Sequence, residues 1–289
     1  MLGILNIHKP TGITSRRVVD RVQRAVRPAK AGHAGTLDPL ACGVLVVCVG
    51  AATRLVEYVQ RMPKQYRATF RLGCTSNTED IEGCVEDLAE APIPSESEVA
   101  AVLPDFIGNI QQRPPAFSAI KVDGRRSYEL ARRGQEVDLQ PRTVVIYSLQ
   151  LVEYAYPQLT LDIHCGSGTY VRSLGRDLAV KMGTGAVMAA LERTSVGRFR
   201  REDACRLDQI SRDAVPQLLQ PAESALSGLP TLVLNTDEIA AISHGRTILA
   251  KSSTACDEVV AFDADGQLVA ILVPRAGGLG PSRSFVSGN

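Results

Sequence analysis

The chain has 289 residues, of which 45% are hydrophobic, so it is long and apolar enough to form about two globular domains. Its seven cysteines include no Cys-x-x-Cys pair and its four histidines show no ligand spacing, so we predict neither a disulfide framework nor a metal site. The formal net charge of +1 excludes no class of partner.

The first residues lack the basic and apolar regions of a signal peptide, and no apolar run approaches the ~20 residues of a membrane span. We therefore expect a cytoplasmic protein. Residues 3–7 predict a short strand, and Lys9 to Gly12 a turn. Ser15 is expected to cap the helix that follows. The apolar residues of that helix recur at helical spacing: Val18, Val19, Val22 and Val26.

Asp38 lies in a stretch rich in glycine, which reads Gly32-His33-Ala34-Gly35-Thr36-Leu37-Asp38-Pro39-Leu40-Ala41. Pro39 disfavours helical backbone at Asp38 and places it in an extended or turn conformation. Residues 43–50 form a continuous apolar run bounded by glycines, which is typical of a strand buried on both faces. The sequence predicts an ionisable carboxylate in a rigid loop beside the core, either as a turn cap or as a catalytic group.

This stretch resembles the catalytic loop of the TruB-type pseudouridine synthases, whose pattern is Gly-His-x-Gly-x-Leu-Asp-Pro-x-Ala. The resemblance implies that Asp38 is the catalytic aspartate, and that His33 takes the space that a flipped base vacates. Residues 9–15 resemble the Lys-Pro-x-Gly-x-Thr-Ser motif of the same family. We include Lys9 among the RNA-binding residues on that basis.

Residues 64–72 alternate between apolar and polar side chains, which predicts a half-buried strand. Its Tyr66 is open to two interpretations, a core aromatic whose hydroxyl reaches water and a functional residue. Residues 64–68 resemble the family's Lys-x-Tyr-x-Ala motif, which implies that Tyr66 lies over the target base. Residues 75–83 resemble an acidic turn of the family, although Ser76 and Asn77 differ from its usual residues. From this turn we include Asp80 in the site.

Residues 95–98 form a capping box that opens a helix, and Pro104 is expected to kink or end it. The stretch from about 111 to 134 combines a proline pair with a basic cluster. It resembles the thumb insertion of the family, which grips an RNA loop, and it contributes Lys121 to the site. A short helix is expected over 128–133, ended by Gly134. A solvated basic face is the alternative interpretation of this cluster.

Residues 143–154 and 158–165 predict two strands, followed by a glycine-rich turn and a helix over 171–182 with Gly183 as its C-cap. The turn lacks the glycine that a hydrolase nucleophile elbow needs two residues before Ser167. It resembles the family's Gly-x-Tyr-x-Arg motif, which implies that Arg172 lies beside the aspartate and that Tyr170 contacts substrate. A guanidinium beside Asp38 is expected to keep that carboxylate charged.

Residues 191–197 resemble the family's Leu-x-Arg-x-x-x-Gly motif, which makes Leu191 either an apolar wall of the uracil pocket or a plain core residue. Residues 215–230 predict a helix and a linker. Residues 232–273 predict short strands around a hairpin turn at 263–266. This last part is similar to a PUA-type RNA-binding domain.

By resemblance, the fold is α+β. A catalytic domain with a mixed sheet spans residues 1–229, with the thumb at about 111–134, and a small β-rich PUA-like domain spans residues 230–289. The implied activity converts uridine 55 in the T-loop of tRNA into pseudouridine. It needs base flipping and no cofactor or metal. The implied partner of this monomeric enzyme is the T-arm stem-loop.

The residue types are compatible with attack by Asp38 at C1′, attack at C6, and proton abstraction through a glycal. Two other functions use the same surface. A tRNA chaperone would bind without catalysis, and a guide-RNA-dependent synthase would act within a larger complex. Binding alone requires no buried carboxylate, and the thumb favours an enzyme that works alone.

Overall fold

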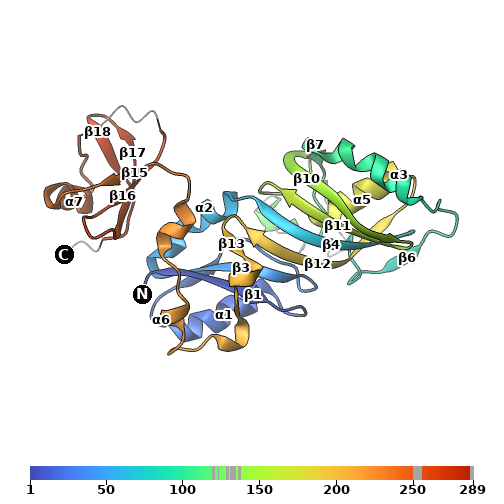
Figure 1. The fold of residues 1–289 in the computed structure, drawn as a ribbon, viewed down its shortest axis with the longest axis horizontal. Helices are drawn as coiled ribbons and strands as arrows, with labels where there is room; N and C mark the ends of the chain where they lie inside the picture. The colour runs from blue at the N-terminus through green and yellow to red at the C-terminus, as the bar shows by residue number, and fades with distance from the viewer. Residues whose placement is uncertain are drawn as a thin grey trace.

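The computed structural model describes residues 1–118, 121, 122, 124–127, 130, 135, 138–249 and 256–286. An elongated body is built on one mixed sheet, and a smaller lobe is attached at one end (Figure 1). We name the elongated part the catalytic body, because the family resemblance implies that it holds the active site. The strands of the large sheet are β1 (Gly3–Lys9), β2 (Ala31–His33), β3 (Cys42–Val49), β4 (Lys64–Leu72), β7 (Gly108–Gln112), β10 (Arg142–Ala155), β11 (Gln158–Cys165), β12 (Ala186–Val196), β13 (Phe199–Arg200) and β14 (Cys205–Arg206). The expected α+β class with a mixed sheet is confirmed.

The order of the sheet is β14-β1-β3-β12-β4-β11-β10-β7, with β2 paired to β3 and β13 paired to β12. Strand β3 is buried on both faces, as its apolar run predicts. Val44, Val46 and Cys48 belong to one core cluster. Leu45 and Val47 belong to another. β3 therefore holds together two layers, and the loop that precedes it is fixed to the centre of the fold.

The helices are α1 (Ser15–Val26), α2 (Val56–Arg61), α3 (Glu96–Val102), α5 (Val171–Lys181), α6 (Val215–Leu218) and α7 (Thr236–Ser243). Short 3-10 turns are η1 (Gly50–Leu55), η2 (Leu103–Phe106), η3 (Arg201–Asp203), η4 (Leu207–Gln209) and η5 (Ala222–Leu226). The capping box at Ser95 is confirmed, and α3 ends before the turn that contains Pro104. The predicted cap of α1 is wrong by one residue. Thr14 accepts from the backbone N–H of Arg17, and Ser15 makes other contacts.

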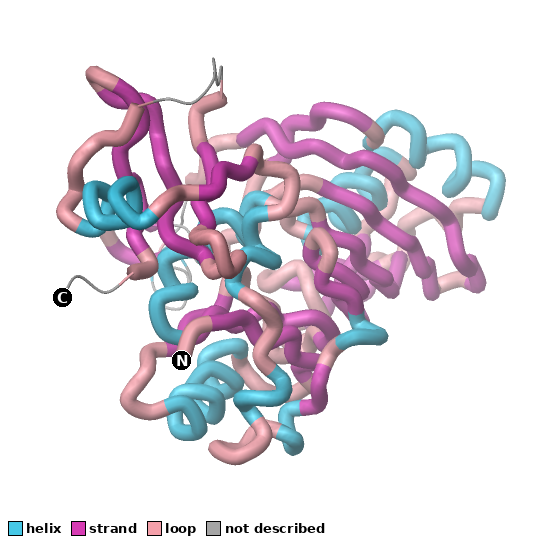
Figure 2. Tube along the Cα trace, turned by 60° about the vertical axis from the view of Figure 1, so that its left-hand side comes forward, coloured by secondary structure: helices cyan, strands magenta, loops and turns pink. Residues whose placement is uncertain are grey.

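Helices α1 and α5 lie on the same face of the large sheet, over different parts of it. α1 packs on β1 and β3, whereas α5 packs on β4, β11 and β12. Arg193 of β12 pairs with Gly43 of β3, so the part of the sheet under α1 is continuous with the part under α5. Figure 2 shows helices over both ends of the sheet with strands between them.

Two small hairpins project from the sheet. β5 (Cys74–Ser76) pairs with β6 (Val85–Asp87), and the two strands enclose the acidic turn. β8 (Lys121–Val122) pairs with β9 (Arg125–Arg126) within the stretch expected to be the thumb. The helix expected over 128–133 lies largely outside the described residues.

The smaller lobe is a four-stranded sheet in the order β15-β16-β17-β18. Its strands are β15 (Thr231–Val233), β16 (Val259–Phe262), β17 (Leu268–Arg275) and β18 (Gly278–Ser284). The predicted turn at 263–266 is confirmed, and the Asp263 carboxylate accepts from the backbone N–H groups of Asp265 and Gln267. The expected short strands are confirmed, and a helix that was not predicted, α7, lies between β15 and β16. Asn235 and Glu238 form its capping box.

The lobe rests on α2 of the catalytic body. Val260 and Ile271 share a core cluster with Leu55 and Val59. Around this apolar contact, the Tyr58 hydroxyl donates to Glu258 at 2.7 Å. The boundary expected between residues 229 and 230 stays a prediction.

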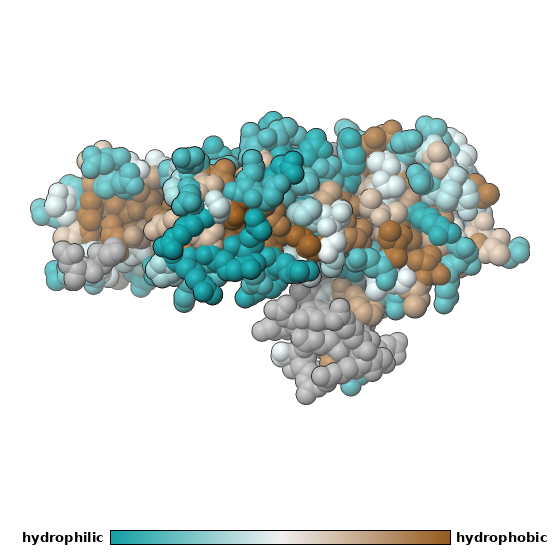
Figure 3. Space-filling view, turned by 90° about the horizontal axis from the view of Figure 1, so that it is seen from below, coloured by the Kyte–Doolittle hydropathy of each residue, from teal (hydrophilic) through white to brown (hydrophobic). Residues whose placement is uncertain are grey.

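Hydrophilic side chains gather in a broad patch near the middle of the face seen in Figure 3. Helix α1 buries its valines and exposes four arginines: Arg16, Arg17, Arg21 and Arg24. Across the described ranges, each helix is too short or too polar to span a bilayer.

Candidate active site

A cleft of about 810 Å³ opens on the face of the sheet that carries α1 and α5. The loop that holds Asp38 forms one side, and the turn before α5 forms the other. Its principal lining residues are Leu37, Asp38, Lys64, Tyr66, Thr78, Asp80, Tyr170, Arg172, Leu191 and Arg193. Six of the residues that the sequence assigned to the site therefore line one cleft: Asp38, Tyr66, Asp80, Tyr170, Arg172 and Leu191.

The Asp38 carboxylate faces this cleft, with 35% of its side-chain surface exposed. Its Oδ2 atom lies 3.1 Å from Nε of Arg172. Among the described residues, no backbone N–H donates to this carboxylate, which a turn cap would require. The geometry thus favours the interpretation of Asp38 as a chemical group.

Arg172 enters the site from the first turn of α5 and is 7% exposed. Besides Asp38, it contacts Oδ2 of Asp80 at 3.4 Å. It also donates to the carbonyls of Thr78 at 2.8 Å and Phe117 at 3.0 Å. One guanidinium therefore ties the catalytic loop, the acidic turn and the start of the thumb together, as a planar fork of several donors allows.

Asp80 is 4% exposed and is itself held in place. Its Oδ1 atom accepts from the Thr78 hydroxyl at 2.6 Å and from the Glu82 N–H at 3.1 Å. Its other oxygen faces Arg172. Asp80 therefore orients the guanidinium from the side opposite Asp38.

Two residues near the N-terminus hold the backbone on both sides of Asp38. The Ser15 hydroxyl donates to the Leu37 carbonyl at 3.0 Å and accepts from the Leu37 N–H at 2.8 Å. The Lys9 ammonium is fully buried and donates to the carbonyls of Pro10, Ile13 and Pro39 at 2.9, 2.7 and 3.3 Å. Burial lowers the pKa of Lys9 to about 8. Lys9 therefore supports the loop from inside the protein. The family resemblance had instead placed Lys9 among the RNA-binding residues.

Arg193 holds the same loop from β12 and is 2% exposed. Its Nε donates to the Val44 carbonyl at 2.7 Å, and its other nitrogens reach the carbonyls of Thr36 and Gly35 at 3.5 and 3.3 Å. The Leu-x-Arg motif predicted a site role for Leu191 alone, and the role of Arg193 was not predicted. The arginine in the motif was itself the signal, because a buried arginine must donate its hydrogen bonds to nearby carbonyls.

Tyr66 and Leu191 form an apolar wall of the cleft, with 9% and 7% of their surfaces exposed. They lie on neighbouring strands, where Leu191 pairs with Ala68 two residues beyond Tyr66. Burial raises the pKa of the Tyr66 hydroxyl, and Arg193 opposes that shift. The hydroxyl therefore stays protonated. The ring of Tyr66 is then a flat, neutral surface on which a base can stack.

The environment of Asp38 has opposing effects on the pKa of its carboxyl. Burial raises this pKa above the ordinary value, and Arg172 opposes the rise without reversing it. Asp80 adds to the rise through its negative charge. The expectation that the guanidinium keeps the carboxylate charged stays a prediction, and Arg172 is the larger of the two opposing charges that favour it.

The remaining assigned residues lie outside the inner cleft or at its rim. His33 lies on β2, and its Nδ1 is buried without a partner in the described part of the chain. Burial lowers its pKa, which keeps the imidazole neutral. The Arg142 guanidinium lies 4.9 Å from the centre of the Tyr170 ring at the rim. The side chain of Lys121 lies outside the described residues.

Besides the contacts of Ser15 and Arg193, an anchor of the acidic turn was not predicted from the sequence. Glu79 has a positive φ of 62°, which is unfavourable for a side chain of this size. Its carboxylate pairs with Arg176 and accepts from the Ser173 hydroxyl at 2.8 Å, so α5 fixes the turn. A sequence pattern carries no warning of such a contact, because it joins residues 94 and 97 positions apart.

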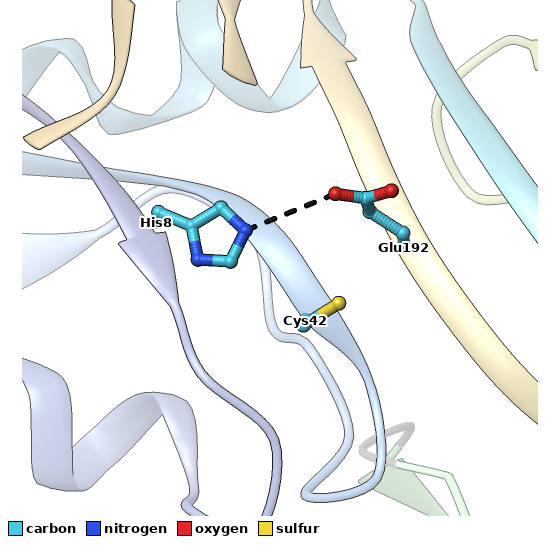
Figure 4. Close-up of side chains that lie close together, drawn as sticks. All are labelled: His8, Cys42 and Glu192. Atoms are coloured by element: carbon cyan, nitrogen blue, oxygen red, sulfur yellow. Dashed lines mark ion pairs between the residues drawn. The ribbon is translucent and has the colours of Figure 1, made fainter. Parts of the chain in front are cut away.

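The structure also brings together three possible metal ligands that spacing along the chain had not suggested. His8, Cys42 and Glu192 lie close together on neighbouring strands (Figure 4). The absence of a metal site therefore stays a prediction. None of the three lines the cleft.

The fold is shared with solved structures of complexes that contain the protein Cbf5. The chain superimposes on an archaeal box H/ACA Nop10-Cbf5 complex structure with a TM-score of 0.73 and 25% identity, covering 99% of this chain and 86% of that one. A Cbf5-Nop10-Gar1 complex matches with a TM-score of 0.74 at the same identity, covering 99% and 85%.

Two family models cover most of the chain. Residues 23–171 match the N-terminal domain of the TruB family pseudouridylate synthases, and residues 172–227 match the tRNA pseudouridylate synthase B C-terminal domain. The chain is 37% identical to the tRNA pseudouridine synthase B of Dehalococcoides mccartyi, over 99% of this chain and 97% of that protein. It is 40% identical to that of Caulobacter sp. strain K31, over 98% and 96%. The chain belongs to the TruB family of pseudouridylate synthases.

Proposed function

We propose that this protein isomerises uridine 55 in the T-loop of tRNA to pseudouridine, with Asp38 as its essential carboxylate. One observation carries the proposal. The Asp38 side chain is partly exposed in a cleft and has a guanidinium 3.1 Å away, with an apolar wall beside it. Both full-length relatives named above are tRNA pseudouridine synthases B.

The reaction breaks the bond between N1 and C1′, turns the uracil, and forms a bond between C5 and C1′. The C5 proton is lost and N1 gains one, so the oxidation state does not change and no cofactor has to supply electrons. The detached uracil must stay in a pocket that excludes water. Tyr66 and Leu191 supply such a wall. Asp38 supplies the group that attacks or removes a proton at the sugar or base.

Arg172 is proposed to hold the Asp38 carboxylate in position and to favour its charged form. The raised pKa of Asp38 makes this role important, because the carboxyl must be ionised to react. Loss of the guanidinium would leave a buried charge without its partner. Asp80 keeps the guanidinium in place, because its two oxygens are held by Arg172, Thr78 and Glu82.

The target base must leave the stack of the T-loop, which costs a few kcal/mol. Stacking on Tyr66 and contacts from the thumb offset this cost. The neutral, partly buried His33 is suited to occupy the space left in the loop, as the family resemblance implies. Tyr170 at the rim, with Arg142 against its ring, offers a surface for a neighbouring nucleotide.

Purified protein and unmodified tRNA transcript, with pseudouridine mapped at each position, test the proposal. We expect one pseudouridine at position 55 without any added RNA or protein. A transcript with cytidine at position 55 is the control and should stay unmodified. Binding of tRNA without any pseudouridine would contradict the proposal and support a chaperone.

The structural likeness to Cbf5 favours one second candidate, a synthase that depends on a guide RNA. The same assay separates the two functions, because a guide-dependent enzyme would be inactive on tRNA alone. The coverage argues against this candidate. The chain covers 97% of a tRNA pseudouridine synthase B but 86% of the Cbf5 complex chain.

A further inference from the structure

Three side chains of different chemistry meet on the face of the sheet opposite the cleft. His8 lies on β1, Cys42 begins β3, and Glu192 lies on β12. Cys42 and Glu192 are direct partners in the pairing of β3 and β12. Their three donor atoms lie within 4.8 Å of one another, and Figure 4 shows the side chains converging.

We propose that His8, Cys42 and Glu192 bind a zinc ion on this face. An imidazole nitrogen, a thiolate and a carboxylate are the donors that zinc prefers. Donors around a tetrahedral zinc ion are separated by about 3.3 to 3.7 Å, given bonds of about 2.0 to 2.3 Å. The distance between Nε2 of His8 and Oε1 of Glu192 is 3.8 Å, and no donor pair is more than 4.8 Å apart, so the donor atoms must approach one another by about 1 Å to bind the ion.

The site is open enough for an ion to enter and for water to be a fourth ligand. His8 and Glu192 keep 35% and 25% of their side-chain surfaces exposed. Cys42 is half-buried. The thiol must release its proton to solvent when the metal binds.

The guanidinium of Arg201 works against the ion. Arg201 lies 2.9 Å from Oε2 of Glu192 and so competes for that carboxylate. The other oxygen, Oε1, faces His8 and remains available. Replacing Arg201 by glutamine should therefore strengthen zinc binding, because the carboxylate loses a competing cation.

The ion would join β1, β3 and β12. Residues that follow two of its ligands in the sequence hold the catalytic loop. Lys9 follows His8 and bonds the carbonyl of Pro39. Arg193 follows Glu192 and bonds the carbonyl of Gly35. The three ligands do not line the cleft, so the ion would stabilise the loop's supports without taking part in the reaction.

Cobalt(II) titration of the full-length, metal-free protein tests the site, because a thiolate bound to cobalt gives an intense near-ultraviolet absorption band. We expect one equivalent to bind with this band and zinc to displace it. Zinc should also raise the melting temperature. Cys42→Ser should weaken zinc binding by at least about tenfold, because even residues in the outer shell of a metal site have effects of that size.

Cys84→Ser is the matched control, since Cys84 is an exposed cysteine outside this cluster. His8→Gln keeps the thiol and tests the second ligand separately. Zinc affinity should fall in His8→Gln, stay unchanged in Cys84→Ser and rise in Arg201→Gln. Absence of the thiolate band in the unmodified protein would overturn the proposal, as would equal zinc affinity in Cys42→Ser and Cys84→Ser. Conversion of tRNA should persist after removal of zinc with a selective chelator while magnesium is kept.

Discussion

The Arg172 guanidinium lies between two carboxylates, with Nε 3.1 Å from Asp38 and Nη1 3.4 Å from Asp80. Asp38 is the more exposed of the two and faces the cleft, whereas Asp80 is almost fully buried. The two acids therefore have different tasks. Asp80 has its remaining oxygen satisfied by the protein, and Asp38 has an oxygen left for substrate.

Replacing Asp38 by asparagine should lower single-turnover pseudouridine formation by at least about a thousandfold, because it removes the reactive charge. The affinity for tRNA should change little, since phosphate contacts supply most of the binding. The thermal stability should be unchanged or slightly higher, because a carboxylate with a raised pKa costs folding free energy when ionised. A turn cap would behave differently, with a loss of about 1 kcal/mol and normal catalysis. A folded Asp38→Asn protein with a near-normal rate would falsify the catalytic assignment.

The rate should fall on acidification with an inflection above 3.8, the ordinary pKa of aspartate, because burial raises the pKa of Asp38. The pH dependence that Asp38 gives to the folding stability has the opposite sign to its effect on the rate. A raised pKa means that the folded state binds the proton more tightly, so this group stabilises the fold at low pH and the contribution is lost as the pH rises through the folded pKa. Single-turnover rates across pH measure the inflection, with tRNA binding and melting temperature followed in parallel. An inflection at or below 3.8 in folded protein would contradict this prediction.

Arg172→Lys tests whether the shape of the guanidinium matters beyond its charge. A lysine ammonium cannot reach two carboxylates and two carbonyls at once. We expect at least about a hundredfold loss of rate and a further rise in the pKa of Asp38, seen as a shift of the acid inflection to higher pH. Arg61→Lys is the control, because Arg61 is exposed and makes one distant ion pair at 3.8 Å. Equal rates for the two variants would show that Arg172 supplies charge alone.

Variants at the neighbouring residues 14 and 15 distinguish the positioning of the loop from the stability of the helix. Ser15→Ala leaves the N–H and carbonyl of Leu37 without their partner, which should cost about 1 to 3 kcal/mol and slow catalysis in the folded protein. Thr14→Ala removes the cap of the same helix, at a cost of about 1 kcal/mol, without touching the catalytic loop. Its rate should be normal. Chemical denaturation and single-turnover rates on both variants make the comparison, and equal rates would show that Ser15 does not position the loop.

Removing residues 230–289 should weaken tRNA binding and leave a folded, slower enzyme, because the assigned catalytic residues all precede residue 200. The segment carries four Lys/Arg and six Asp/Glu. We therefore expect a modest loss of affinity, about threefold to tenfold. The truncation also uncovers Leu55 and Val59, so the free energy of unfolding should fall.

Tyr58→Phe is the control for this truncation, since it removes the hydroxyl bonded to Glu258 but keeps the lobe. Its tRNA affinity should be normal. A truncated protein that stays folded but is inactive at saturating tRNA would place part of the site in the lobe.

Local sequence determined the secondary structure of the catalytic body closely. The alternation of residues 64–72 and the apolar run of residues 43–50 specify strands because burial on one or both faces depends on side-chain periodicity. The capping box at Ser95 fixes the start of α3 through hydrogen bonds between residues three apart. The motifs around Asp38, Tyr66 and Arg172 identified the family and the parts of the cleft.

The tertiary structure decided which groups support these residues and how they are charged. The bonds from Ser15 to Leu37, from Lys9 to Pro39 and from Arg193 to Gly35 span 22, 30 and 158 positions, so no local pattern could predict them. The raised pKa of Asp38 follows from the balance between desolvation and Arg172, which depends on burial in the assembled cleft. His8, Cys42 and Glu192 likewise meet only because β1, β3 and β12 are adjacent in the sheet, since ligands are brought together by strand order and not by spacing along the chain.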